Sequence, residues 1–459
     1  MFELSLNQRK LKCDFNLQLV NAFKEPIVFY LMDKRDKRSF FLSFVIVDAS
    51  KQEVIFLDTY SKDNLDIYNK LKSDEQFVLK RTPHRSVVAV TGKKFYTFVQ
   101  DERFFFCVDC SSLKMQVMTL DERIGDKNYK IQKISASIFY DYYNNNYLYI
   151  SAIDTEQNLH IYHASIDLQE IVEIYTEKGH RTTPHSIVNY KNHLYLSHDF
   201  GNVDFRNKRK NEISNSDQIV EGLDMQVIKK RIMNRNTNSS EKEMREEVVK
   251  EFFNDKNYEV ERGKIALLDL NTFQMKTYYT SGASPAHFEF DFEKDYIYIV
   301  SHNFFGWEGR NIFISPAIID KFKITDDGLV LLNRFSYAKG FRYATHKLFY
   351  RDKKCYICTM AQPNRLIVVD ASTMKLVFYY DIGEDKLSDK NNVRDYLNSN
   401  NSHDEIVAVL ASKDGNYLVL ISNIYIYYFD IEKRSIAQKI KYNEEGKDWV
   451  IRTVHADYI

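Results

Sequence analysis

One motif recurs along the whole chain: a short apolar strand that ends in aspartate, followed by a turn and a second strand. The aspartates of the seven copies are Asp48, Asp109, Asp167, Asp269, Asp320, Asp370 and Asp430. Most copies are about 50 to 60 residues apart, close to the period of a propeller blade. An aspartate carboxylate can accept a backbone N–H two residues further on, which closes a tight turn. The motif therefore predicts a repeat architecture built from β-strands.

Two more apolar segments precede each motif, so each repeat supplies four strands. We predict an all-β fold, a seven-bladed β-propeller of four-stranded antiparallel blades. The first repeat has only three good strands, and the C-terminal segment VIRTVHADYI from Val450 is expected to complete it. Pairing the two chain ends in one blade would remove the open sheet edges of an unclosed ring. The propeller then covers residues 26–459, and residues 1–25 form an N-terminal cap or edge segment.

The step from Asp167 to Asp269 contains a charged insertion at residues 203–262. Apolar residues at Met244, Val248 and Phe252 recur at helical spacing, which predicts a helical insertion in blade four. Two interpretations stay open, a solvated spacer and a lid that also offers a surface to a protein partner.

Composition excludes several classes of partner. The chain has 64 basic and 64 acidic residues, so no net charge attracts it to nucleic acid or to a membrane surface. The first residues lack the apolar core of a secretory signal, and we expect a cytoplasmic protein. Two cysteine pairs, Cys107/Cys110 and Cys355/Cys358, have a metal-site spacing, but they fall in apolar strand segments. A spacing of three on a strand points the two side chains to opposite faces.

Histidines recur at equivalent positions of the repeats. His84, His185, His287 and His346 stand at the start of a blade's first strand, and His455 would do so in blade one. His198 and His302 end the second strands of blades four and five. Because neighbouring strands in a blade are antiparallel, all these positions are expected at one mouth of the central channel.

Converging imidazoles suit a transition metal such as Fe, Cu or Zn. The predicted metal ligands are His84, His185, His287, His346 and His455. The predicted catalytic acids are Glu308 and Asp101, and the predicted substrate pocket consists of His198, His302, Trp307, Arg310, Arg342 and Tyr343. The alternative role for each histidine is structural, a hydrogen bond that fixes one strand to its neighbour.

The segments TPHSIVNYKNHLYLS from Thr183 and NRLIVVDASTMKLVFYYDIG from Asn364 resemble the repeats of the YVTN and lactonase-like propeller superfamily. The chain departs from that pattern in its long insertions and in having only 14 glycines. The resemblance implies a propeller fold, and one fold hosts many functions.

Two function classes remain. The first is a metal-dependent enzyme, an oxidoreductase or lyase, acting on a small molecule at the histidine-lined mouth. The second is a non-catalytic propeller that binds a peptide or protein partner at the same face. A lactonase-like hydrolase is a third class, but its acidic metal ligands find no match in this sequence.

Overall fold

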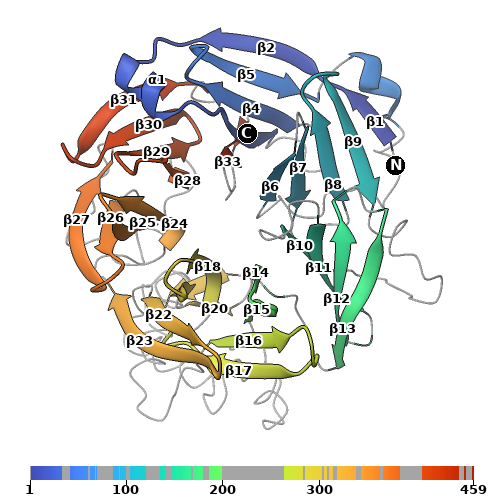
Figure 1. Cartoon of the computed structure of the whole chain (residues 1–459). Helices are drawn as coiled ribbons and strands as arrows, with labels where there is room; N and C mark the ends of the chain where they lie inside the picture. The colour runs from blue at the N-terminus through green and yellow to red at the C-terminus, as the bar shows by residue number, and fades with distance from the viewer. Residues whose placement is uncertain are drawn as a thin grey trace, which may run out of the picture.

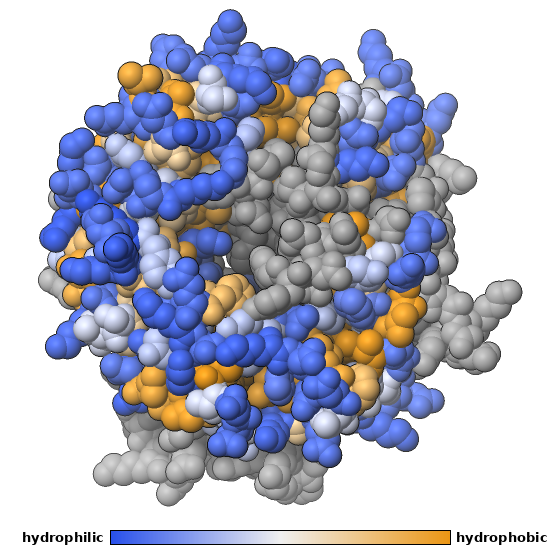
Figure 2. All heavy atoms as spheres, viewed as in Figure 1, coloured by the Kyte–Doolittle hydropathy of each residue, from blue (hydrophilic) through white to orange (hydrophobic). Residues whose placement is uncertain are grey.

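The computed structural model shows a ring of seven β-sheets (Figure 1). The space-filling view shows a hollow at the centre of the ring, the mouth of a central channel (Figure 2). It describes residues 2–33, 42–59, 62–67, 69, 86–91, 94–99, 104–119, 135–140, 147–154, 156, 158–166, 169–178, 184, 186–198, 263–282, 285–301, 304–307, 310–313, 318–336, 343–361, 365–382, 406–443, 449–450 and 457–458. The insertion at 203–262 lies outside these residues, so its helical character and its role as a lid remain predictions.

Three blades carry four strands each in chain order from the channel outward, with no further strand among the described residues. Blade three contains β10 (Ser135–Tyr140), β11 (Tyr147–Ile153), β12 (Asn158–Ser165) and β13 (Ile171–Lys178). Blade six contains β24 (Tyr343–Arg351), β25 (Lys354–Ala361), β26 (Arg365–Asp370) and β27 (Lys375–Asp381). Blade seven contains β28 (Ile406–Ala411), β29 (Tyr417–Ser422), β30 (Tyr425–Asp430) and β31 (Ser435–Lys441).

Blades four and five also have four strands, and each carries a long connection between its second and third strands. Blade four contains β14 (Ser186–Tyr190), β15 (His193–His198), β16 (Lys264–Asp269) and β17 (Met275–Tyr279). Blade five contains β18 (Pro285–Asp291), β19 (Tyr296–Ser301), β22 (Ile318–Thr325) and β23 (Gly328–Ser336). Its connection forms a separate hairpin, β20 (Phe304–Trp307) and β21 (Arg310–Phe313).

Blades one and two gain strands from the N-terminus. Blade two contains β6 (Ser86–Thr91), β7 (Lys94–Val99), β8 (Phe104–Asp109) and β9 (Lys114–Thr119), with β1 (Phe2–Ser5) added outside β9. Blade one contains β3 (Ile27–Asp33), β4 (Leu42–Asp48) and β5 (Glu53–Asp58), with β2 (Asn7–Lys12) added outside β5.

The ring closes as the sequence predicted. Two short C-terminal strands, β32 (Trp449–Val450) and β33 (Asp457–Tyr458), pair antiparallel with β3 on the channel side of blade one. Both chain ends therefore contribute to the same sheet, which is one way to leave no open edge at the junction.

The residues before β3 bind across the junction as well. The short helix α1 (Leu17–Ala22) follows β2, and its first turn is capped by Asn16, whose side chain accepts from the Leu19 N–H. Phe15 and Phe23 pack edge-on against Tyr428 in blade seven. One stretch of 25 residues thus contacts blades two, one and seven in turn.

The apolar core lies between the blades. Separate clusters of buried side chains join blades three and four, four and five, five and six, and six and seven. Cys355 belongs to the cluster on one face of blade six and Cys358 to the cluster on the other. The opposite-face prediction is confirmed for this pair, and burial raises the pKa of the Cys355 thiol to about 12, so both sulfurs act as core atoms.

The repeated aspartate closes the outer turn in five blades. Asp109, Asp269 and Asp370 accept the backbone N–H two residues on, at 2.8, 2.7 and 2.8 Å. Asp48 and Asp430 accept the N–H three residues on, at 3.0 and 2.9 Å. Burial opposes ionisation of Asp48, Asp370 and Asp430, but hydrogen bonds from backbone N–H groups and neighbouring side chains hold the pKa of all five carboxyls below its usual value.

The prediction is wrong for Asp320. This residue lies inside β22, which continues to Thr325, and its carboxylate is fully buried and accepts the Ser281 N–H from blade four. At eight residues its strand is longer than the five strands in which the aspartate closes the turn, so the turn comes five residues later. Asp167 lies outside the described residues.

Candidate functional site

Two of the predicted histidines meet between blades five and six. His287 is on β18 and His346 on β24, the first strands of the two blades, and their ring centroids are 5.1 Å apart. Both side chains are buried, at 8% and 7% exposure. The strand directions agree with the prediction, because Pro285 at the start of β18 pairs with Ser301 at the end of β19.

A carboxylate holds one of these rings. Glu289 lies two residues after His287 on the same face of β18, and its Oε1 is 3.0 Å from Nδ1 of His346. Its other oxygen accepts the Leu348 N–H at 3.3 Å. Burial opposes ionisation of Glu289, but the His346 hydrogen bond and the nearby Lys347 charge leave its pKa below the usual value. An ionised Glu289 accepts a hydrogen bond from the Nδ1–H of His346, and in that tautomer Nε2 of the ring carries the lone pair.

Glu289 was missed at the sequence level, although the signal was present. In the stretch HFE, residues 287 and 289 alternate on a strand and so share a face. The predicted acids were chosen instead from loops, at Asp101 and Glu308, and both lie outside the described residues.

Most of the remaining predicted residues cannot be placed relative to this pair. His84, His185, His302, His455 and Arg342 lie outside the described residues. His198 is the last residue of β15 and pairs with Lys264. It lies at the same end of blade four as the start of β14. The backbone of Trp307 pairs with that of Arg310 in the β20–β21 hairpin, and Tyr343 begins β24, where it pairs with Ala361. Only the backbone is described at these four positions.

Among the residues with described side chains, no three histidine, cysteine, aspartate or glutamate residues are grouped so that they could hold a metal ion. The pair of rings with its carboxylate supplies two nitrogens. Any fuller ligand set would need residues beyond that part of the chain.

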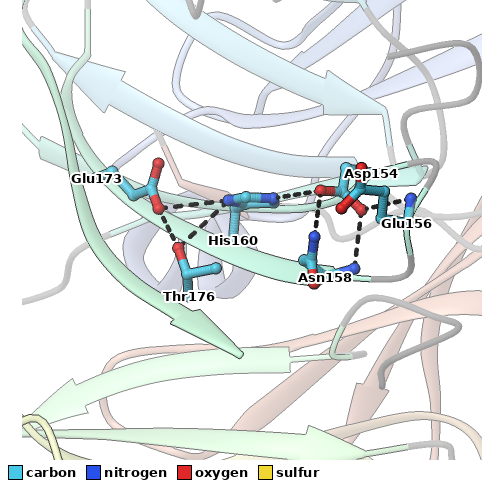
Figure 3. A network of polar contacts seen from close by, with 6 residues as sticks. All are labelled: Asp154, Glu156, Asn158, His160, Glu173 and Thr176. Atoms are coloured by element: carbon cyan, nitrogen blue, oxygen red, sulfur yellow. Dashed lines mark hydrogen bonds and ion pairs between the residues drawn. The ribbon is translucent and has the colours of Figure 1, made fainter. Parts of the chain in front are cut away.

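A second histidine network lies in blade three (Figure 3). His160 on β12 is buried between two acids, with Nε2 3.1 Å from Asp154 and Nδ1 3.4 Å from Glu173. Thr176 on β13 donates to Glu173 and lies 3.4 Å from Nδ1 of the ring. Asp154 also accepts the N–H groups of Glu156 and Asn158, both at 2.8 Å. These contacts use both nitrogens of the His160 ring, which indicates a network that fixes the β11–β12 connection.

A different kind of feature lies on the outer rim. The outer strands of blades four, five and six expose large apolar side chains, with Tyr279 at 57%, Val330, Leu331 and Leu332 at 49%, 46% and 50%, and Tyr379 at 48%. These strands follow one another around the ring (Figure 1), and apolar atoms show between polar ones along this part of the rim in the space-filling view (Figure 2). We name the exposed apolar side chains of β17, β23 and β27 the apolar rim.

No helix in the described part of the chain is long and apolar enough to cross a membrane. No protein-family model matches the sequence, and no curated protein matches it. A chain of the solved structure described as "Crystal Structure of Mitotic Checkpoint Complex" aligns with 79% of this chain and 79% of its own length, at a TM-score of 0.45 and 7% sequence identity. A likeness of this size carries no argument about function. The fold itself is established by the strand pairings: the chain is a seven-bladed β-propeller.

Proposed function

We propose that this chain is a non-catalytic propeller that binds a protein partner. The observation that carries the proposal is the apolar rim, and above all the three consecutive apolar residues Val330, Leu331 and Leu332 of β23, each about half exposed. Contiguous exposed apolar surface of this kind marks interaction sites more often than it marks an ordinary surface. We therefore propose the apolar rim as the partner site, in place of the channel mouth that the sequence had suggested.

The test is proximity labelling in the native cell, comparing the wild-type chain with a Leu331→Gln, Leu332→Gln double variant. We expect the variant to lose at least one labelled protein about tenfold while its melting temperature stays unchanged. His346→Asn serves as the control at the mouth and should leave the labelled set intact. Identical sets for wild type and the rim variant would refute the proposal.

A metal site at the mouth is the second candidate function. It is favoured by the oriented ring of His346, with His287 beside it, because a carboxylate behind a histidine is the usual arrangement around metal ligands. The proposed ligands are these two rings with His84, His185 and His455, and the bound ion would be Fe, Cu or Zn. Affiliation with the YVTN and lactonase-like superfamily likewise remains a proposal.

This second candidate is tested on protein purified without an affinity tag and loaded with Fe(II), Cu and Zn under anaerobic conditions. One equivalent of bound metal, weakened at least tenfold in both His346→Asn and His287→Asn, would support it. Metal-free protein after loading would refute it without affecting the rim proposal.

A further inference from the structure

The outer edges of the seven blades differ in regularity. In blades three, five, six and seven, the pairing of the third and fourth strands is interrupted by a register shift. In blades one, two and four the same pair runs without a shift. A bulge interrupts the ladder groups and twists an edge away from a partner, whereas a regular edge remains a template for another strand.

Two of the three regular edges are already used by this chain. In blade two, β1 pairs with β9 over four residues, and in blade one, β2 pairs with β5 over six. No bulged outer strand receives an added strand in the described part of the molecule. The outer strand of blade four, β17, is the regular edge that remains, with β16 as its single described neighbour in the sheet.

The two added strands also match their edges in charge. Lys114 on β9 meets Glu3 on β1 at 2.6 Å. Asp58 and Glu53 on β5 meet Arg9 and Lys10 on β2 at 2.8 and 3.1 Å. The edge strand β9 thus pairs its lysine with an acidic residue of β1, and the edge strand β5 pairs its two acidic residues with basic residues of β2. The sequence of β17 is MKTYY, whose one charged side chain, Lys276, is exposed.

The backbone of β17 presents defined donors. Thr280 donates its N–H to Gly263 on the β16 side. Because alternate residues of an antiparallel strand turn their N–H and C=O groups to opposite sides, those of Thr277 and Tyr279 point away from β16. Tyr279 adds an aromatic ring that is 57% exposed.

We infer that β17 is a docking edge for an extended, acidic segment of a partner protein, which adds a fifth strand to blade four as β1 and β2 do to blades two and one. Its carboxylates pair with Lys276, and its apolar side chains pack beside Tyr279. The inference names a site within the apolar rim, so it rests on the proposed partner-binding function. It adds a directional backbone contact that the apolar side chains alone do not require.

The probe is an N-acetylated hexapeptide of alternating glutamate and valine that carries a benzophenone group for photo-crosslinking to the whole chain. We expect crosslinks at residues 275–280, identified by mass spectrometry. A peptide with lysine in place of glutamate should give at least tenfold less product, and added salt should weaken the acidic peptide.

Thr277→Pro removes one outward N–H without touching the ladder to β16, because proline is tolerated on an edge strand where its nitrogen faces solvent. We expect it to lower the crosslink yield about tenfold, and Thr277→Val, which keeps the N–H, to restore it. Lys276→Glu should reverse the charge preference, whereas Lys375→Glu on the bulged β27 should not change it. Circular dichroism and melting temperature confirm that the variants fold.

Several results would overturn the inference. They are crosslinks elsewhere, equal labelling by both peptides, or insensitivity to Thr277→Pro. A dimer that Thr277→Pro converts to monomer in sedimentation would show that a second copy occupies the edge. Crosslinking only after deletion of residues 203–262 would show that the chain covers the edge itself. The Leu331→Gln, Leu332→Gln variant distinguishes this inference from the proposed function. If that variant loses the labelled partner but still crosslinks the peptide at β17, the two proposals concern separate sites.

Discussion

The junction where the ring closes, at blades one, two and seven, differs from the opposite side, at blades four to six, in how its outer sheet edges are covered. The N-terminal residues cover the outer edges of blades one and two and pack against Tyr428 of blade seven. They bury Leu4, Leu19 and Phe23 to 2% exposure or less. Across blades four to six, the outer strands keep large apolar side chains in contact with solvent. Edge protection is thus concentrated at the junction where a ring would otherwise open, and the outer strands of blades four to six carry no added strand in the described part of the chain.

The largest expected effect comes from removing the N-terminal segment. Deleting residues 1–25 takes away five buried apolar side chains, at Leu4, Leu6, Phe15, Leu19 and Phe23. At roughly 2 kcal/mol each, the loss is on the order of 10 kcal/mol, which is comparable to the whole stability of a typical domain. Denaturant titration should show no cooperative transition. A transition like that of the full chain would mean that residues 1–25 are not needed for stability.

Single side-chain truncations compare the buried N-terminal segment with the exposed apolar rim. Phe23→Ala should cost about 3–5 kcal/mol, because the ring is 2% exposed and packs on Tyr417 and Tyr428. Leu331→Ala on the rim should change the free energy of unfolding by less than about 0.5 kcal/mol. Similar losses for both, measured by chemical denaturation, would argue that the rim is structural.

Asn64 tests, with a smaller expected effect, how polar contacts attach the N-terminal segment to blade one. It is 1% exposed and its side chain accepts the Ser5 N–H at 3.0 Å and donates to the Ser5 and Thr59 carbonyls, both at 2.8 Å. Asn64→Ala should lower the free energy of unfolding by about 2 kcal/mol, since buried backbone groups lose their partners. Asn333→Ala is the control, because Asn333 is exposed on β23, where its side chain donates to the Thr373 carbonyl at 3.3 Å and accepts the adjacent Arg334 N–H at 2.8 Å. An equal loss at both positions would contradict the role given to Asn64.

The smallest effect is a pH dependence. The pKa of the Glu289 carboxyl is lowered in the folded state, so its stabilising effect is present above the unfolded-state pKa of about 4.3 and is lost as the pH falls through the lower folded value. Glu289→Gln should flatten this part of the acid slope, whereas Glu432→Gln on the exposed surface should not. An unchanged acid slope in Glu289→Gln would show that the His346 contact does not stabilise the charged carboxyl.

Part of this account was predictable from sequence. Asp109 and Asp370 indicated the outer turns because the carboxylate acts on neighbouring N–H groups, a local interaction. The C-terminal strand was predictable because blade one lacked a fourth apolar segment. By contrast, the pairing of β1 with β9 joins residues over 100 positions apart, and no local pattern in FELS specifies its partner.

The site was less predictable for a similar reason. His287 and His346 could be aligned by their position in the repeat, but the contact of Glu289 with His346 depends on how two blades face each other. Asp320 shows the opposite failure, because its sequence matches the motif while a longer strand moves the turn beyond it. The regularity of β17 depends on the register of the strands, which residue types alone do not reveal.

Residue-resolved hydrogen exchange tests most directly whether β17 is the open counterpart of the covered edges. The amides of β5 and β9 that face β2 and β1 should be protected in the free chain. Those of Thr277 and Tyr279 should exchange at nearly the rate of an unstructured peptide and become protected when the acidic hexapeptide is added. Protection of Thr277 and Tyr279 without any peptide, or no change on its addition, would contradict the account.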